Sequence, residues 1–424
     1  MTADIGGAFV RASLPEDQVV HVLLDRESAA ILVQIDDSYA EFVRNDGTMV
    51  VKLNKALYGL VQAARLWYDE LSKLLNANGY LVNPVDVCVW YKKMEDELSV
   101  IVFHVDDLMV VGPTDASLND IEDILRNAFK DVKVKRGLRH NYLGMLFDFT
   151  EPGYVSVCMT AYIERMLEDF EIEGKVSTPA ARCLFEVNGD CMKLNNDDRV
   201  KFHSMVQRIM YLSKRTRWDL LTAVSFLTGR VREPDEDDMK KLIRVLKYLN
   251  GTKNLSLRLG CNNPFVVIAS IDASHAVHDK GRSHGGMSLS LGVGAVESSS
   301  KKLKLNTKSS TESEIVSLSD NASPALGLRN FLVGFGFNVG PLVIEQDNEA
   351  CILMMKRGRS ESANTKHINV RYFFLKDRID KNEVELKYVP TENMVSDILT
   401  KPLQGALFLR LRNILLGHAS DDAD

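Results

Sequence analysis

Two adjacent aspartates stand between two apolar runs in the stretch FHVDDLMVVG, residues 103–112. Two like charges this close in a poorly hydrated setting repel, so either one carboxyl group keeps a proton or a cation joins the pair. The stretch therefore points to metal-dependent chemistry at Asp106 and Asp107. The residues alone leave a second interpretation open, an ordinary turn whose aspartates point at water.

Four further acids occupy similar places in the last third of the chain. Asp272 is expected to end an apolar strand, Glu314 to lie in the opening turn of a helix, Asp347 to end a later strand and Asp397 to lie in the opening turn of the final helix. Ligands of an α/β sheet gather beyond the carboxyl ends of its strands, and carboxylates from several elements suit Mg²⁺. Each acid also has a local alternative: a capping box from Thr311 for Glu314, a turn or N-cap for Asp347, and a helix-dipole partner for Asp397.

The apolar pattern indicates which elements would position these acids. LSVIVFHV and LMVVG predict a hairpin with the aspartate pair at its turn, and residues 60–79 predict a helix that Gly79 ends. A middle region is more helical, with helices expected over 162–170, 200–231 and 235–252 and a surface loop over 176–198.

From about residue 263 strands and helices mix. Strands are expected in 264–274, 285–292, 295–304, 342–346 and 384–390, and helices in 310–332, 347–357, 371–382 and 392–403. This order predicts an α/β domain with a mixed sheet covered on both faces.

Composition limits the classes of protein. The chain has 424 residues, of which 45% are hydrophobic and 26% charged, so we expect a globular protein of more than one domain. The six cysteines form no C-x-x-C pair, which argues against zinc and disulfides. No membrane span or secretory signal is visible, so an intracellular setting is the default.

The net charge of −6 is unusual for a nucleic-acid binder, although residues 301–308 and 214–218 are locally basic. Solvated lysines on a loop are the alternative for either stretch.

The chain resembles a known family through a series of motifs. In order they are DIGGAF, KLNKALYGLVQAARLWY, HVDDLMVVG, YLG, YLSKRTRWDLLTAVSFL, VLKYLNGTKNLSLRL, DAS, KSSTESE, TKHINVRY and VELKYVPTENMVSDILTKPL. Together they resemble the reverse transcriptase and ribonuclease H of a copia-type retrotransposon Pol polyprotein, over about residues 4 to 404.

The resemblance implies an α+β and α/β multidomain fold. Residues 1–135 would be a partial reverse-transcriptase palm, 136–262 a helical thumb or connection, and 263–405 a ribonuclease H-like mixed five-stranded sheet with helices on both faces, followed by a C-terminal tail, 406–424.

The resemblance also implies roles for single residues. The metal-binding acids of the palm would be Asp4, Asp106 and Asp107, holding two metals about 3.5 to 4 Å apart. Nucleotide and template would be bound by a further set: Phe9, Gly59, Gln62 and His104. Phe9 would crowd a ribonucleotide's 2′ hydroxyl, although a phenyl ring there also suits a core. Asp272, Glu314, Asp347 and Asp397 would be the ribonuclease H tetrad.

The cofactor implied is Mg²⁺, two per site, with Mn²⁺ as a substitute. The implied partners are an RNA template, a DNA primer, an RNA–DNA hybrid and deoxynucleotides, with no membrane, in a cytoplasmic particle or the nucleus.

Several positions depart from the family pattern. His104 stands where Tyr is usual, Ala64 and Trp218 each replace a Pro, and Ser274 and His275 follow Asp272 in place of the usual residues. Asp4 lies three residues after Met1, so we expect the fingers to be missing and polymerase activity to be impaired, because positioning supplies much of the rate of phosphoryl transfer. Two other hypotheses stay open: a catalytically inactive remnant that at most binds nucleic acid, and a stand-alone nuclease whose palm only holds a duplex.

Overall fold

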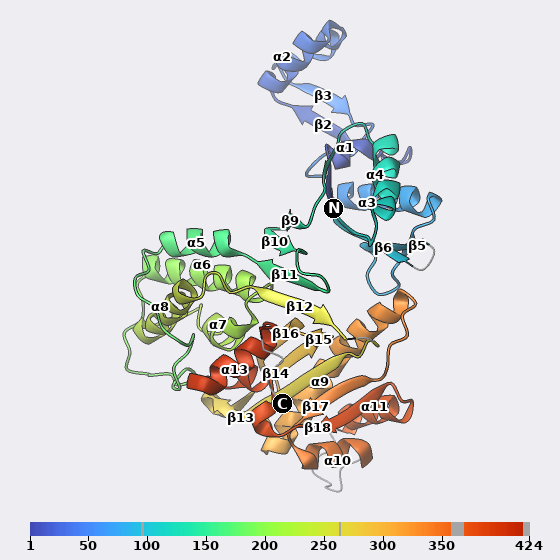
Figure 1. Cartoon of the computed structure of the whole chain (residues 1–424). Helices are drawn as coiled ribbons and strands as arrows, with labels where there is room; N and C mark the ends of the chain where they lie inside the picture. Colours follow the sequence, from blue (N-terminus) through green and yellow to red (C-terminus); the bar gives the residue numbers. More distant parts are fainter. Residues whose placement is uncertain (95–96, 263, 358–368, 419–424) are drawn as a thin grey trace. The chain divides into compact units, whose positions relative to one another are not determined.

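The computed structural model describes residues 1–94, 97–262, 264–357 and 369–418. It divides into two compact units, Met1–Gly137 and Leu138–Asp424, and each unit is considered by itself (Figure 1). Of the TKHINVRY motif, residues 365–368 lie outside the described residues.

The first unit is built on a six-stranded sheet with the order β4-β5-β6-β7-β1-β8. Its strands are β1 (Thr2–Ile5), β4 (Leu81–Val82), β5 (Val89–Met94), β6 (Glu97–His104), β7 (Asp107–Val111) and β8 (Val132–Lys135). The predicted hairpin is confirmed, because β6 and β7 pair antiparallel across the two residues 105–106. A separate two-stranded ribbon joins β2 (His21–Leu24) to β3 (Met49–Lys52).

The α-helices described in this unit are α1 (Ala8–Arg11), α2 (Arg26–Ile35), α3 (Ala63–Ala77) and α4 (Asp115–Ala128), of which α2 lies against the β2–β3 ribbon (Figure 1). In α3, Trp67, Leu71 and Leu75 recur at helical spacing and are buried against the sheet. The helix predicted from residue 60 therefore exists, and it is followed by Gly79 at φ +81°, a conformation that favours glycine.

The second unit contains an antiparallel sheet that the sequence did not predict. Its order is β15-β12-β11-β10-β9, and its strands are β9 (Arg139–Tyr142), β10 (Met145–Asp148), β11 (Tyr154–Cys158), β12 (Leu257–Cys261) and β15 (Gly292–Val293). The strands are short, and β11 pairs with β12 across about a hundred intervening residues, so no local pattern announces the sheet.

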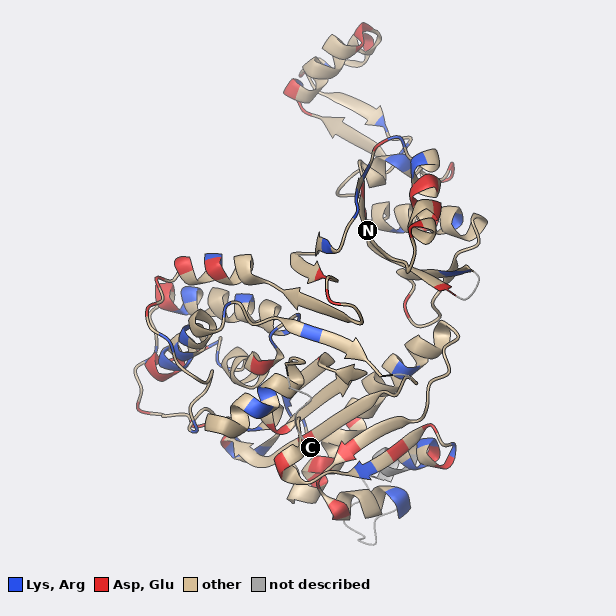
Figure 2. Cartoon of the chain, viewed as in Figure 1, with Lys and Arg blue, Asp and Glu red and all other residues tan. Residues whose placement is uncertain are grey.

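Four α-helices lie between β11 and β12 along the chain: α5 (Thr160–Glu168), α6 (Asn196–Ser213), α7 (Leu221–Thr228) and α8 (Glu236–Gly251). The single helix expected over 200–231 is wrong, because α6 ends at Ser213 and α7 starts at Leu221. Arg217 and Asp219 form a buried ion pair in the break, and the Trp218 indole N–H donates to the Ala295 carbonyl at 2.9 Å. These tertiary contacts hold the backbone in a short 3₁₀ turn instead. In α6 and α8 the acidic residues stand in the first turn and the basic residues follow them, so both signs occur in this part of the chain (Figure 2).

A five-stranded mixed sheet, β16-β14-β13-β17-β18, confirms the expected α/β portion. Its strands are β13 (Ile268–His278), β14 (Arg282–Ser290), β16 (Ala295–Lys302), β17 (Leu342–Gln346) and β18 (Val384–Tyr388). The β13–β17 and β17–β18 pairs are parallel and the β13–β14 and β14–β16 pairs are antiparallel.

Helices cover both faces of the mixed sheet. One face packs on α9 (Ser310–Gly334), α10 (Glu349–Arg357) and α11 (Asn369–Asp380), with Ala269 and Ile271 in their shared core. On the other face Ser270 contacts Ser396 and Gly286 lies against Leu399, next to α12 (Asp397–Thr400) and α13 (Gly405–Leu415).

The chain end departs from expectation in two ways. The helix predicted over 392–403 is reduced to a 3₁₀ turn at Thr391–Asn393 and the four-residue α12, because the conformation of Lys401 is extended before Pro402. The stretch expected to be a tail from residue 406 contains most of α13, which buries Phe408, Leu411 and Leu415 in the core shared with α5–α8. Among the described residues, no helix combines the length and the apolar character needed to cross a bilayer.

Candidate active sites

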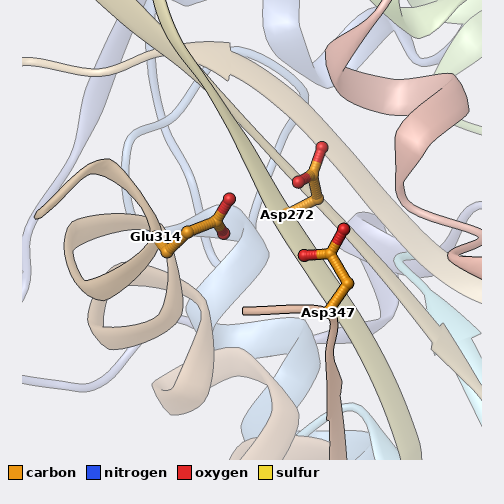
Figure 3. Close-up of side chains that lie close together, drawn as sticks. All are labelled: Asp272, Glu314 and Asp347. Atoms are coloured by element: carbon orange, nitrogen blue, oxygen red, sulfur yellow. The ribbon is translucent and has the colours of Figure 1, made fainter. Parts of the chain in front are cut away.

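Three acids from distant parts of the chain meet at one edge of the mixed sheet. Asp272 comes from β13, Glu314 from α9 and Asp347 from the residue that follows β17, and one carboxylate oxygen of each lies within 4.8 Å of the others. Figure 3 shows the three carboxyl groups turned toward a common space. Asp272 and Glu314 are only 2% and 5% exposed. Among the described residues, this is the group of His, Cys, Asp and Glu side chains with the spacing of a metal site.

The positions of two acids differ from the sequence expectation. Asp272 does not end its strand, because β13 continues to His278 and pairs through Asp272 with Gly286 of β14. Glu314 lies just beyond the first turn of α9, whose acid is Glu312. Both acids are displaced into the fold from the ends of their elements, and this accounts for their burial.

The capping alternatives for Glu314 and Asp347 are wrong. Ser309 caps α9 by accepting from the Glu312 N–H, and Glu312 accepts from the Lys308 N–H, so Glu314 takes no part in capping. Asn348, rather than Asp347, accepts from the Cys351 N–H at the start of α10. Both acids are therefore free of the capping role that the sequence offered them.

Burial and neighbouring carboxylates raise the pKa values of Glu314 and Asp397. Burial, followed by the charges of Asp272 and Asp347, raises the pKa of Glu314 well above its ordinary value. Burial, followed by Asp272, raises the pKa of Asp397 to about 7, although Lys401 acts in the opposite direction. Without a cation, the site favours retention of protons at pH values where exposed carboxyl groups have lost them.

Asp397 belongs to the same edge of the sheet but has a partner of its own. It lies outside the three-acid group, and its Oδ1 accepts from Lys401 Nζ at 2.6 Å. Thr400, which directly precedes Lys401, donates a hydrogen bond from its hydroxyl to Asp272 Oδ2. The four predicted acids therefore gather as three that share a space and a fourth that is paired with a lysine.

Gln346 organises the cluster and was missed by sequence reasoning. It is fully buried, donates its amide to Glu314 Oε2 at 3.2 Å, and accepts from the N–H groups of Asp347 and Asn348 at 2.8 and 3.0 Å. Thr391 adds a hydroxyl donor to Asp347 Oδ2 at 2.8 Å. A glutamine at the end of the strand LVIEQ, directly before an acid, was the available signal.

The unusual residues after Asp272 take part in a polar cluster. His275 Nδ1 lies 3.0 Å from the Ser313 hydroxyl, which in turn lies 2.7 Å from Thr307 and 3.0 Å from Ser283. These contacts join the far end of β13 to the start of α9, one residue before Glu314. Ser274 is buried beside them.

A second group of acids lies in the first unit. β1 pairs antiparallel with β7 so that Asp4 stands directly opposite Asp107, and the Ile5 N–H donates to the Asp106 carbonyl at 3.2 Å. The structure thus brings Asp4 beside the aspartate hairpin. These three carboxyl groups do not converge as closely as the cluster around Asp272.

The hairpin carries backbone strain and charge repulsion. Val105 has φ 60°, which is unfavourable for a β-branched residue, and its carbonyl accepts from the Trp67 indole at 2.5 Å. Burial, followed by the charges of Asp106 and Asp4, raises the pKa of Asp107 even though its side chain is exposed. Crowding of carboxylates is thus present here, as the paired aspartates suggested, and Trp67 is a supporting residue that sequence reasoning missed.

The residues expected near nucleotide and template surround this hairpin. Phe9 packs against Tyr58 with ring centroids 4.5 Å apart, and the Tyr58 hydroxyl donates to Asp106 Oδ2 at 3.4 Å. Three others occupy exposed or half-buried positions: Gly59 at φ +99°, Gln62 directly before α3, and His104 opposite Asp107 in the hairpin. Their binding roles stay predictions.

The basic stretch 214–218 is not a basic surface throughout. Arg217 has 0% exposure and makes a two-pronged ion pair with Asp219, which also accepts from the Tyr248 hydroxyl at 2.7 Å. The other basic stretch, 301–308, exposes its lysines.

Comparisons with known proteins show which proteins this chain resembles. Residues 12–181 match the family model described as reverse transcriptase (RNA-dependent DNA polymerase). The retrovirus-related Pol polyprotein from transposon TNT 1-94 of Nicotiana tabacum is 29% identical over 88% of this chain and 28% of its own length. That from transposon RE1 of Arabidopsis thaliana is 30% identical over 85% of this chain and 24% of its own length. The chain thus spans about a quarter of the length of these polyproteins.

Among solved structures, the foamy viral protease-reverse transcriptase in complex with an RNA/DNA hybrid aligns with 96% of this chain and 45% of its own, with a TM-score of 0.53 and 13% identity. At 13% sequence identity, this similarity shows a shared fold.

Proposed function

This chain is related over most of its length to the Pol polyproteins of copia-type retrotransposons, and on that premise we propose that its second unit contains a metal-dependent nuclease for RNA paired with DNA. The observation that carries the proposal is the convergence of Asp272, Glu314 and Asp347. Asp397, on the adjacent helix α12, completes the tetrad.

The donor set fits Mg²⁺. It consists of carboxylate oxygens, with no sulfur or imidazole in the group, and hard oxygen ligands select Mg²⁺ or Mn²⁺ over softer metals. Burial, followed by repulsion from Asp272 and Asp347, raises the pKa of Glu314, and a divalent cation removes this kind of instability. When bound, such ions lower the pKa of a coordinated water and neutralise charge on the phosphate.

The residues of the chain would hold and orient these groups. Gln346 fixes one oxygen of Glu314, and Thr391 fixes one oxygen of Asp347, so the remaining oxygens are left for metal. The buried position of Asp272 limits the water around the shared space, which strengthens electrostatic interactions there. Scissile phosphate and attacking water would approach from the open side at Asp347, which is half-buried.

For the first unit we propose a reverse-transcriptase palm. The support is the match of residues 12–181 to the reverse transcriptase family and the juxtaposition of Asp4 and Asp107. Asp4, Asp106 and Asp107 would hold the metals for nucleotide addition from deoxynucleotides on an RNA template. On this proposal the palm is 1–135, the thumb or connection 136–262 and the nuclease 263–405.

A labelled RNA–DNA hybrid tests the nuclease. The purified chain should cut the RNA strand with Mg²⁺, and Asp347→Asn should reduce cleavage by about a thousandfold or more, because a ligand of the reacting metal is lost. Asp377→Asn, an exposed acid of α11, is the matched control and should cleave as the unchanged chain does. Full cleavage by Asp347→Asn would refute the assignment.

Absence of cleavage by the unchanged chain with either Mg²⁺ or Mn²⁺ would instead favour an inactive remnant that at most binds nucleic acid. Primer extension tests the palm separately. Loss of extension in Asp106→Asn, with nuclease activity retained, would support the assignment of the palm.

A further inference from the structure

Lys401 lies inside the acid cluster rather than at its edge. Its Nζ is 2.6 Å from Asp397 Oδ1 and 3.5 Å from Asp272 Oδ2. No other lysine or arginine among the described residues forms an ion pair with Asp272, Glu314, Asp347 or Asp397. The ammonium group thus lies between Asp272 and Asp397. A second cation, bound outside the three-acid space, would need these same two acids as ligands.

The cluster is therefore divided into two unlike halves. In the first half, Asp272, Glu314 and Asp347 share a space, no lysine or arginine among the described residues forms an ion pair with Glu314 or Asp347, and the neutral Gln346 amide donates to Glu314 instead. In the second half, one oxygen each of Asp272 and Asp397 faces the Lys401 ammonium, and Thr400 also donates to that oxygen of Asp272. A divalent cation could enter the first half directly, whereas the second half already holds a positive charge.

The side chain of Lys401 can leave without disturbing the backbone. Its main-chain N–H donates to the Asp397 carbonyl at 2.9 Å, and the residue ends α12. The side chain is 36% exposed, so its flexible four-carbon stem has a route to solvent. Asp397, by contrast, is held 4% exposed on a helix whose Ile398 carbonyl accepts from Thr222 at 2.6 Å.

We propose that Lys401 is a built-in counter-ion that occupies the second cation position between Asp272 and Asp397. Divalent cations therefore bind in a fixed order, first at Asp272, Glu314 and Asp347, and then at Asp272 and Asp397 once Lys401 has swung out. This inference rests on the proposed nuclease function and assigns Lys401 a positioning role in it.

Calorimetric titration of Mg²⁺ into the whole chain tests the order of binding. All arms carry Asp106→Asn and Asp107→Asn, so that the palm acids do not add to the signal. The chain that retains Lys401, called the Lys401 chain, should show one tighter and one weaker Mg²⁺ site. In Lys401→Met the weaker site should tighten by about tenfold or more, because a positive charge a few ångströms away no longer opposes the ion.

Two further variants separate the counter-ion from a purely structural contact. Lys401→Arg keeps the charge and should keep the weaker site weak. Lys381→Met removes a lysine with the same i, i+4 spacing to an acid, Asp377, and should change neither site. In EDTA, Lys401→Met should unfold at a lower temperature than the Lys401 chain, and Mg²⁺ should remove most of that difference.

The outcomes distinguish this inference from the proposed function. If the Lys401 chain binds no Mg²⁺ and Asp347→Asn changes nothing in the titration, the metal site itself is wrong and the proposed function fails with it. If the first site binds but Lys401→Met leaves the second as weak as before, only the role of Lys401 is overturned.

Discussion

The contribution of the acid cluster to the stability of the metal-free protein should fall as pH rises, and Mg²⁺ should abolish that fall. The pKa of Asp397 in the fold is raised to about 7 from an ordinary 3.8. A carboxyl group with a raised pKa stabilises the fold fully below its unfolded pKa, and this contribution is lost as pH rises through the folded value. The pKa of Glu314 is raised as well, so it acts in the same direction.

The size of the effect follows from the shift. Between about pH 5 and the folded pKa of about 7 lie two pH units, and each contributes about 1.4 kcal/mol, so Asp397 alone accounts for at most about 3 kcal/mol. In a unit of this size, that corresponds to a fall of roughly 5 to 10 °C in the unfolding temperature.

Two buried histidines act in the opposite direction and must be separated. Burial lowers the pKa of His278 to about 4 and of His284 to about 3, so both stay neutral in the fold and favour unfolding as pH falls below about 6.5. They lie 2.8 Å apart and neither is a ligand of the acid cluster. Their contribution is therefore the same with and without Mg²⁺.

Thermal unfolding at about pH 5 and about pH 8, each with EDTA and with saturating Mg²⁺, isolates the acids. The stabilisation by Mg²⁺ should be larger at the higher pH, and Asp397→Asn, which cannot titrate, should reduce that difference. Equal stabilisation by Mg²⁺ at both pH values, or a difference unchanged in Asp397→Asn, would refute the reasoning.

Three substitutions test how the fold supports the site. Arg217→Ala should lower the free energy of unfolding by about 3 to 5 kcal/mol in urea titrations, because Asp219 is left buried and unpaired; a loss under 1 kcal/mol would contradict this. Thr222→Val should leave the Ile398 carbonyl without its donor and cost about 1 to 3 kcal/mol, lowering RNA cleavage more than primer extension. Gly286→Ala should reduce cleavage, since its Cβ would lie 2.8 Å from Leu399 Cβ; wild-type cleavage would show that α12 yields.

Local signals in the sequence reached a good part of the fold. The 97–111 hairpin, the helix that starts at Ala63 and the strands of the mixed sheet were all predictable, since alternating or helical spacing of apolar residues is written within a few turns of chain. The antiparallel sheet that joins β11 to β12 was not, because its pairing depends on contacts about a hundred residues apart. The break at Arg217 was missed for a related reason, since Arg217 donates to the Thr252 carbonyl and Trp218 to the Ala295 carbonyl, both distant along the chain.

By itself the sequence determined which acids are candidates, because paired aspartates at a turn and acids near strand ends are visible in a single chain. The tertiary structure alone decided that Asp272, Glu314 and Asp347 share a space, that Gln346 orients them, and that Lys401 faces Asp397. The physical reason is that burial and repulsion depend on the distance between charges in space. Residues 272 and 347 are far apart along the chain and become neighbours only when β13 and β17 pair.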